Sequence, residues 1–130
     1  MKKYDLVIRN GHTVTATDKV KQDVGIKDGK IVALGLNLET GTRDIDAEGL
    51  LILPGGVDAH CHIEQRSSSG IMTADDFYSG SVSAAFGGTT TVLPFAAQHR
   101  GQSLRQVVDD YMACAVPKAV IDYGFHLIIS

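Results

Sequence analysis

The sequence has little of what would mark a disulfide-bonded, nucleic-acid-binding or membrane-spanning protein. Two cysteines, Cys61 and Cys114, are too few for a disulfide framework and fit a reducing cytoplasm. Lys and Arg together number 12 against 15 Asp and Glu, with no block of like charge, so no nucleic-acid partner is expected. No apolar run approaches the roughly 18 residues that a membrane span needs. The basic start, residues 1–3, is not followed by an apolar segment, so we expect a cytoplasmic protein rather than a secreted one.

What is present is a globular composition with an excess of glycine. Of the 130 residues, 44% are hydrophobic, and a folded chain of this length can bury a real core. The 14 glycines indicate many tight turns. The hydrophobic pattern changes character near Pro54, and this predicts two parts, residues 1–53 and residues 54–130.

Residues 1–53 have the pattern of short β-strands. Hydrophobic residues alternate there with polar ones, which is the period of a half-buried strand. Asn10-Gly11 and Asp28-Gly29 interrupt the alternation, and such pairs favour tight hairpins because both residues adopt positive φ. We therefore predict about five or six short, mostly antiparallel strands, with a hairpin at each of the two pairs.

Residues 54–130 alternate between strand and helix patterns. Strands are expected over 57–62, 89–95 and 121–129, where apolar and β-branched residues concentrate. Helical spacing fills the two segments between them. Successive strand-helix-strand units predict a parallel sheet in an α/β fold.

The limits of the two expected helices can be read from their capping residues. Thr73 and Asp76 resemble a capping box with Thr73 as the N-cap, and Ser103 begins the second helix in the same way. Glycines at 87–88 are expected to end the first helix. The stripe predicted to face the core on that helix consists of Tyr78, Val82, Ala85 and Phe86.

His60 and His62 are the strongest candidates for chemistry. Residues i and i+2 of a strand share a face, so both imidazoles project together while Cys61 points to the other side as a small buried hydrophobe. Two imidazoles at the end of a parallel strand can bind one divalent metal. Asp58 shares their parity and can accept a ring N–H, which would fix the tautomer. A His-x-His pair without a metal is also common, so spacing alone leaves both readings open.

Five segments together resemble a known family. Residues 54–62, Pro-Gly-Gly-Val-Asp-Ala-His-Cys-His, resemble the Pro-Gly-x-x-Asp-x-His-x-His signature of the amidohydrolase superfamily. Residues 4–11 and 25–31 are similar to its cyclic amidohydrolase branch, and residues 73–77 and 87–90 look like dihydropyrimidinases and D-hydantoinases. The resemblance runs along nearly the whole chain and implies the N-terminal part of such an enzyme.

The resemblance also implies an architecture. Residues 1–53 would form part of a β-sandwich domain, and residues 54–130 the first three strands and two helices of an incomplete (β/α)8 barrel. A complete barrel typically needs about 250 residues. The complete protein would be a homo-oligomer, with a tetramer expected from the family.

For the chemistry, the resemblance implies a divalent metal, foremost zinc, with two ions in the complete enzyme. His60 and His62 would bind the first ion, while a bridging Lys, a second His pair and a proton-shuttling Asp would come from later strands. Hydroxide activated by the metal would open a small cyclic ureide or amide, such as a hydantoin or a dihydropyrimidine. Lys118 lies at the end of a helix and cannot replace the bridging Lys, so we expect these 130 residues alone to be inactive.

The segment after His62 corresponds to the loop that gates the substrate side chain in hydantoinases. Dihydroorotases carry an Arg at the place of Glu64, and we interpret Glu64 here as a solvated loop carboxylate. The loop could equally be a mobile connector. Its candidate residues are Glu64, Ser67, Ser68, Ser69, Gly70, Ile71 and Met72.

Two further histidines and an alternative function complete the expectations. His126 lies within the third expected strand and is interpreted as a core histidine, and His99 as a surface residue. The alternative to an enzyme is a non-catalytic scaffold related to dihydropyrimidinases, or a truncated remnant. His60 and His62 favour the enzyme lineage, because the scaffold branch lacks an intact ligand set.

Overall fold

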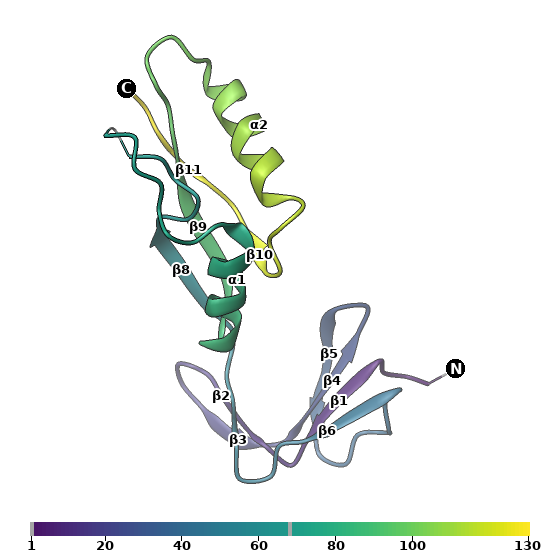
Figure 1. Ribbon diagram of the computed structural model, residues 1–130. Helices are drawn as coiled ribbons and strands as arrows, with labels where there is room; N and C mark the ends of the chain where they lie inside the picture. The colour runs from purple at the N-terminus through teal and green to yellow at the C-terminus, as the bar shows by residue number, and fades with distance from the viewer. Residues whose placement is uncertain (1, 68) are drawn as a thin grey trace. The chain divides into compact units, whose positions relative to one another are not determined.

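The computed structural model describes residues 2–67 and 69–130, and the chain divides into two compact units (Figure 1). The first unit ends at Pro54 and the second begins at Gly55. Within the described residues, no helix has the length and apolar character needed to cross a membrane.

The first unit contains two small sheets. The larger has the strand order β5-β4-β1-β6, and β1 pairs antiparallel with β4 and parallel with β6. The smaller has the order β3-β2-β7, with β2 antiparallel to β3 and parallel to β7. The strands are β1 (Leu6–Arg9), β2 (His12–Val14), β3 (Lys19–Lys21), β4 (Asp23–Lys27), β5 (Lys30–Gly35), β6 (Arg43–Asp46) and β7 (Leu51–Ile52).

One of the two predicted hairpins is confirmed and the other is wrong. Asp28 and Gly29, with φ of 50° and 71°, join β4 to its antiparallel neighbour β5. Asn10 also has a positive φ of 62°, but β1 and β2 enter different sheets. Close packing rather than a hairpin requires glycine at position 11, because a Cβ on Gly11 would lie 2.6 Å from Ile52 Cδ1. The long-range pairing of β2 with β7 therefore decides the path of the chain after β1.

The second unit has the alternating order expected from its pattern. Strand β9 is central, with β8 on one side and β10 and β11 on the other, and all of these pairs are parallel (Figure 1). Its elements are β8 (Gly56–Cys61), α1 (Phe77–Phe86), β9 (Thr89–Ala97), α2 (Leu104–Ala115), β10 (Asp122–Tyr123) and β11 (His126–Ile128).

The third strand expected in this unit is interrupted. Tyr123 pairs with Val92 and His126 with Phe95, so the register is the same on both sides of the gap. This register sets Phe125 opposite Pro94, which has no N–H to donate. The missing donor accounts for the division into β10 and β11.

Helix α1 begins later and buries another face than the sequence predicts. Its N-cap is Asp76 and not Thr73, because the Asp76 side chain accepts a hydrogen bond of 2.8 Å from the backbone N–H of Ser79. Phe77 and Ser81 are buried, whereas Tyr78 and Phe86 of the predicted stripe are 58% and 91% exposed.

Ser81 can occupy the buried face of α1 because its hydroxyl group is satisfied there. The hydroxyl donates to the carbonyl of Phe77 and accepts from the backbone N–H of Val120. A rule based on side-chain hydrophobicity cannot find such a residue. The predicted end of the helix is confirmed by Gly88, with φ of 84°, and the predicted N-cap of α2 by Ser103, which accepts from Gln106 N.

Both helices pack on one face of the parallel sheet. The core cluster joins Phe77 of α1 and Ala115 of α2 to Val92 of β9. Burial alternates along β9, so Val92 belongs to the helix-covered face, whereas Phe95 belongs to the other. The candidate site lies on this second face, at the carboxyl end of the strands.

Candidate metal centre

The two histidines of the His-x-His pattern lie together at the carboxyl end of β8. Their ring centroids are 5.7 Å apart and the ring planes are inclined by 75°. Both rings also contact Phe95, at centroid distances of 4.7 Å for His60 and 5.3 Å for His62, and both residues are exposed. Phe95 thus forms an apolar floor beneath two accessible imidazoles.

A β-bulge immediately precedes His62. Asp58 pairs with Val92 and Cys61 with Pro94, so two residues of β8, Ala59 and His60, lie opposite the single residue Leu93 of β9. Strict alternation of side chains therefore does not continue from Asp58 to His60. Asp58 Oδ1 accepts a hydrogen bond of 3.0 Å from the backbone N–H of His60. The carboxylate of Asp58 thus binds the backbone of His60 and not the imidazole N–H that the sequence had predicted.

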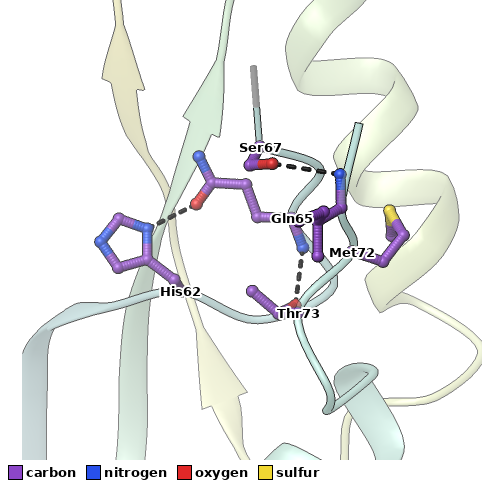
Figure 2. Close-up of a pocket in the computed structure, with 6 residues that line it drawn as sticks. His62, Gln65, Ser67, Met72 and Thr73 are labelled. Carbon is purple, nitrogen blue, oxygen red and sulfur yellow. Dashed lines mark hydrogen bonds between the residues drawn. The ribbon is translucent and has the colours of Figure 1, made fainter. Parts of the chain in front are cut away.

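Gln65 orients the second imidazole, a residue that the sequence pattern did not single out. Figure 2 shows its side chain reaching to the His62 ring, where Gln65 Oε1 lies 2.5 Å from His62 Nδ1. An amide oxygen only accepts, so Nδ1 carries the ring proton and the Nε2 lone pair is left available. The backbone N–H of Gln65 is itself held by Thr73 Oγ1 at 3.0 Å. The sequence signal that could have identified Gln65 is its position in the loop three residues after His62.

The geometry of the pair fits a shared metal ion. With metal–nitrogen distances of about 2.1 Å, two imidazoles on one tetrahedral ion have centroids about 5 Å apart. The observed 5.7 Å is close to this value. No group of three or more His, Cys, Asp or Glu within residues 2–67 and 69–130 could hold a metal ion. Within the described residues, His60 and His62 could therefore supply two ligands at most.

The segment after His62 is a hydrogen-bonded hairpin. Backbone hydrogen bonds of 2.7–3.0 Å join its two arms, from Glu64 to Asp75, from Thr73 to Gln65 and from Ser67 to Ile71. Ser67 and Ser69 share a side-chain hydrogen bond, Gly70 has a φ of 84°, and Ser68 lies outside the described residues. A hollow of about 430 Å³ is lined by His62, Gln65, Ser67, Ile71, Met72 and Thr73.

The interpretation of Glu64 as a solvated carboxylate is wrong. Its side chain is only 16% exposed, and Oε1 lies 2.6 Å from Lys118 Nζ. Oε2 accepts a hydrogen bond of 3.1 Å from the backbone N–H of Phe77, at the first turn of α1. The hydrogen bond to Glu64 raises the pKa of Lys118. The N-terminus of α1 and Lys118 thus stabilise the charge of the largely buried Glu64 carboxylate.

His126 also differs from its expected place, since it is exposed and not in the core. Its Nε2 lies 3.1 Å from the carbonyl oxygen of Ala59, and its ring lies 5.2 Å from that of Phe95. His99 is exposed, as expected for a surface residue. Cys61 packs against the core cluster, where burial, followed by the charge of Asp58, raises the pKa of its thiol.

Comparison with known proteins gives consistent matches. A sequence profile described as the amidohydrolase family matches residues 51–128. A D-hydantoinase of Geobacillus stearothermophilus is 48% identical over 125 residues, and a dihydropyrimidinase of Rattus norvegicus is 37% identical over 131 residues. A solved structure of a D-hydantoinase superposes with a TM-score of 0.91 at 45% identity.

These matches cover nearly all of this chain but a small part of each relative. The alignments include 95% of this chain and 26% of the Geobacillus protein, and 96% of this chain and 25% of the rat protein. The superposition with the solved D-hydantoinase includes 96% of this chain and 27% of that one. The chain therefore spans about a quarter of the length of its relatives.

Proposed function

The chain belongs to the amidohydrolase family, and on this premise we propose that it is the N-terminal portion of a metal-dependent hydrolase that opens hydantoin or dihydropyrimidine rings. The single observation that carries the proposal is the pair of accessible imidazoles, His60 and His62, at the carboxyl end of β8. Catalytic residues of parallel α/β folds lie at this end of the strands. Residues 1–53 would be part of a β-sandwich, and residues 54–130 part of the (β/α)8 barrel.

Members of the amidohydrolase family are generally metal-dependent, and His60 and His62 would hold a divalent ion, foremost zinc, in this proposal. Such an ion lowers the pKa of bound water and polarises the carbonyl group of the amide. Gln65 keeps the proton of His62 on Nδ1, so Nε2 is left with the lone pair that would bind the ion. Phe95 limits the rotation of both rings by contact with each of them.

The hairpin after β8 would contact the substrate. The hollow beside His62 is lined by the apolar side chains of Ile71 and Met72, which are 70% and 45% exposed. An exposed apolar pair next to the metal ligands suits the substituent on a hydantoin or dihydropyrimidine ring. We assign Ser67, Ile71 and Met72 to this contact.

The role of Glu64 supports a neutral ring over one with a carboxylate. Dihydroorotases hold the substrate carboxylate with an Arg at this place, and here Glu64 instead joins the hairpin to α1 and Lys118. With its charge paired to Lys118, Glu64 supplies no cation for a substrate carboxylate. This favours hydantoins and dihydropyrimidines over dihydroorotate.

The experiment compares metal content and ring opening in the protein at its natural length. The variant His60→Ala/His62→Ala is measured against wild type and against His99→Ala, which removes an exposed imidazole from the same unit. We expect the double variant to lose bound zinc and hydrolysis of hydantoin and dihydrouracil, with His99→Ala unchanged. Unchanged zinc content in the double variant would contradict the ligand assignment.

Residues 1–130 alone should be inactive in the same assay. Within the described residues the donor set at the site is the two imidazoles, and a tetrahedral ion needs further ligands. Ring opening by the purified 130-residue chain that a chelator abolishes would contradict this expectation. A metal-free protein of natural length would favour the non-catalytic scaffold.

A further inference from the structure

We propose that His126 is a positioning residue for the metal pair: its imidazole holds the carbonyl of Ala59 and thereby fixes the bulge from which His60 projects. The inference rests on the proposed function, since it concerns the metal held by His60 and His62. It assigns to β11, two strands away from β8, a part in the geometry of the site.

The bulge in β8 needs hydrogen-bond partners other than the regular ladder. Ala59 and His60 lie between the paired residues Asp58 and Cys61 and have no register partner of their own on β9. A bulge takes backbone groups out of the regular ladder, and these need other partners. The N–H of His60 donates to Asp58 Oδ1 at 3.0 Å, and the carbonyl of Ala59 accepts from His126 Nε2 at 3.1 Å. Two side chains thus bind backbone groups at the bulge.

The contact between His126 and Ala59 crosses three strands. β11 pairs with β9 on the side opposite to β8, and His126 is in register with Phe95. The His126 ring lies against Phe95 at 5.2 Å, and the His60 ring lies against the same Phe95 at 4.7 Å. The rings of His60 and His126 therefore both contact Phe95. The hydrogen bond from His126 to Ala59 is a second link between β11 and β8.

The hydrogen bond defines how His126 acts. A carbonyl oxygen can only accept, so Nε2 of His126 carries the proton and donates it. The nitrogen that faces β8 is therefore committed to the backbone of Ala59. His126 influences the metal through the residue before His60 and is not itself assigned as a ligand.

Loss of the His126 donor should lower the affinity for the metal. Without it the Ala59 carbonyl loses this hydrogen bond, and the backbone that orients the His60 imidazole is less restrained. Removing a group that orients a metal ligand typically costs about 10-fold to 100-fold in metal affinity. Because His126 is exposed and acts through the backbone, we expect the lower end, about 10-fold.

The experiment exploits two amides that mimic different ring nitrogens. In His126→Gln the side-chain amide nitrogen can take the place of Nε2, whereas in His126→Asn it is one methylene too short. His99→Asn is the matched control on an exposed histidine. Each zinc-loaded protein, at its natural length, is mixed with a chromogenic chelator, and the rate of zinc release is recorded together with the urea midpoint of unfolding.

We expect zinc release about 10-fold faster in His126→Asn, and within about 2-fold of wild type in His126→Gln and His99→Asn. Equal rates in the Asn and Gln variants, or a wild-type rate in His126→Asn, would overturn the proposal. If His126→Asn unfolds at lower urea, the zinc-release rates of the Asn and Gln variants are compared at a temperature where both are folded. A ratio of these rates near one overturns the proposal. Wild-type zinc content in His60→Ala/His62→Ala would instead show that the proposed function has failed.

Discussion

The centres of the two units are built from different kinds of interaction. In the first unit a carboxylate, Asp23, is buried at 6% exposure and accepts hydrogen bonds from Arg9 and from the backbone N–H groups of Asn10 and Leu38. In the second unit the centre is Phe77, with no exposed surface, whose ring lies 6.0 Å from that of Phe125. The first unit combines this polar centre with a few buried apolar side chains, such as Val7, whereas the second relies mainly on apolar packing.

The difference follows from the elements that each unit contains. Short strands in two small sheets cover little apolar surface, and Ile31 and Leu34 of β5 remain 67% and 57% exposed. Polar bonds such as those of Asp23 then select the register. In the second unit two helices cover one face of the sheet, and their side chains form a continuous cluster.

The largest expected effect tests the apolar centre of the second unit. Phe77→Ala should lower the free energy of unfolding of that unit by about 4 kcal/mol, since it removes a buried aromatic side chain and leaves a cavity. The control is Phe86→Ala, the same substitution on the same helix at a side chain that is 91% exposed. Hydrogen exchange followed by mass spectrometry reports each unit separately. Equally faster exchange in residues 2–54 would show that the two units unfold together.

The next effect tests the polar centre of the first unit. Asp23→Ala should destabilise that unit by about 3 kcal/mol, because the backbone N–H groups of Asn10 and Leu38 lose their acceptor and Arg9 keeps, among the described residues, only Asp44 as an ionic partner. Asp18→Ala, at an exposed aspartate, is the matched control. The same exchange measurement should show the loss in peptides of the first unit. A loss no larger than that of Asp18→Ala would contradict a polar centre.

The smallest effect is the response to acid. Hydrogen bonds lower the pKa of Asp5, through Lys27, and of Asp44, through Arg9, in the first unit. In the second unit the backbone N–H of Ser79 lowers the pKa of Asp76. A carboxyl group with a lowered folded-state pKa stabilises above its unfolded pKa, near 3.8, and this contribution is lost as the pH falls through the folded value.

We therefore expect stability to fall below about pH 4 in both units, and further in the first, where more of these carboxylates lie within the described residues. Hydrogen exchange between pH 5 and about pH 3, corrected for the intrinsic rate, measures the difference. A larger loss in the second unit would reverse the comparison.

Much of the second unit could be predicted from local patterns. The β-branched run at 89–95 became β9, and Ser103 caps α2 as its side chain predicts. The start of α1 was misplaced because Thr73 and Asp76 both suit an N-cap, and the choice depends on the tertiary contact of Glu64 with Phe77 N. In the first unit the Asn10-Gly11 turn was present, but the strand partners were decided far along the chain.

The candidate site shows the same division. The spacing of His60 and His62 predicts that their rings lie together, and they do so in the structure. Gln65 and His126 were missed or misplaced as partners of the site, because their contacts depend on a hairpin and on a strand two positions away. No local pattern encodes such contacts.

The sequence by itself predicted a parallel strand with His60 and His62 at its carboxyl end. Only the tertiary structure decided the orientation of the two imidazole rings. The bulge at Ala59 and His60 breaks the period, and its backbone groups are held by Asp58 and by His126. The physical reason is that hydrogen-bond partners of an irregular backbone are supplied by whatever the fold brings near, and that proximity is not written in local spacing.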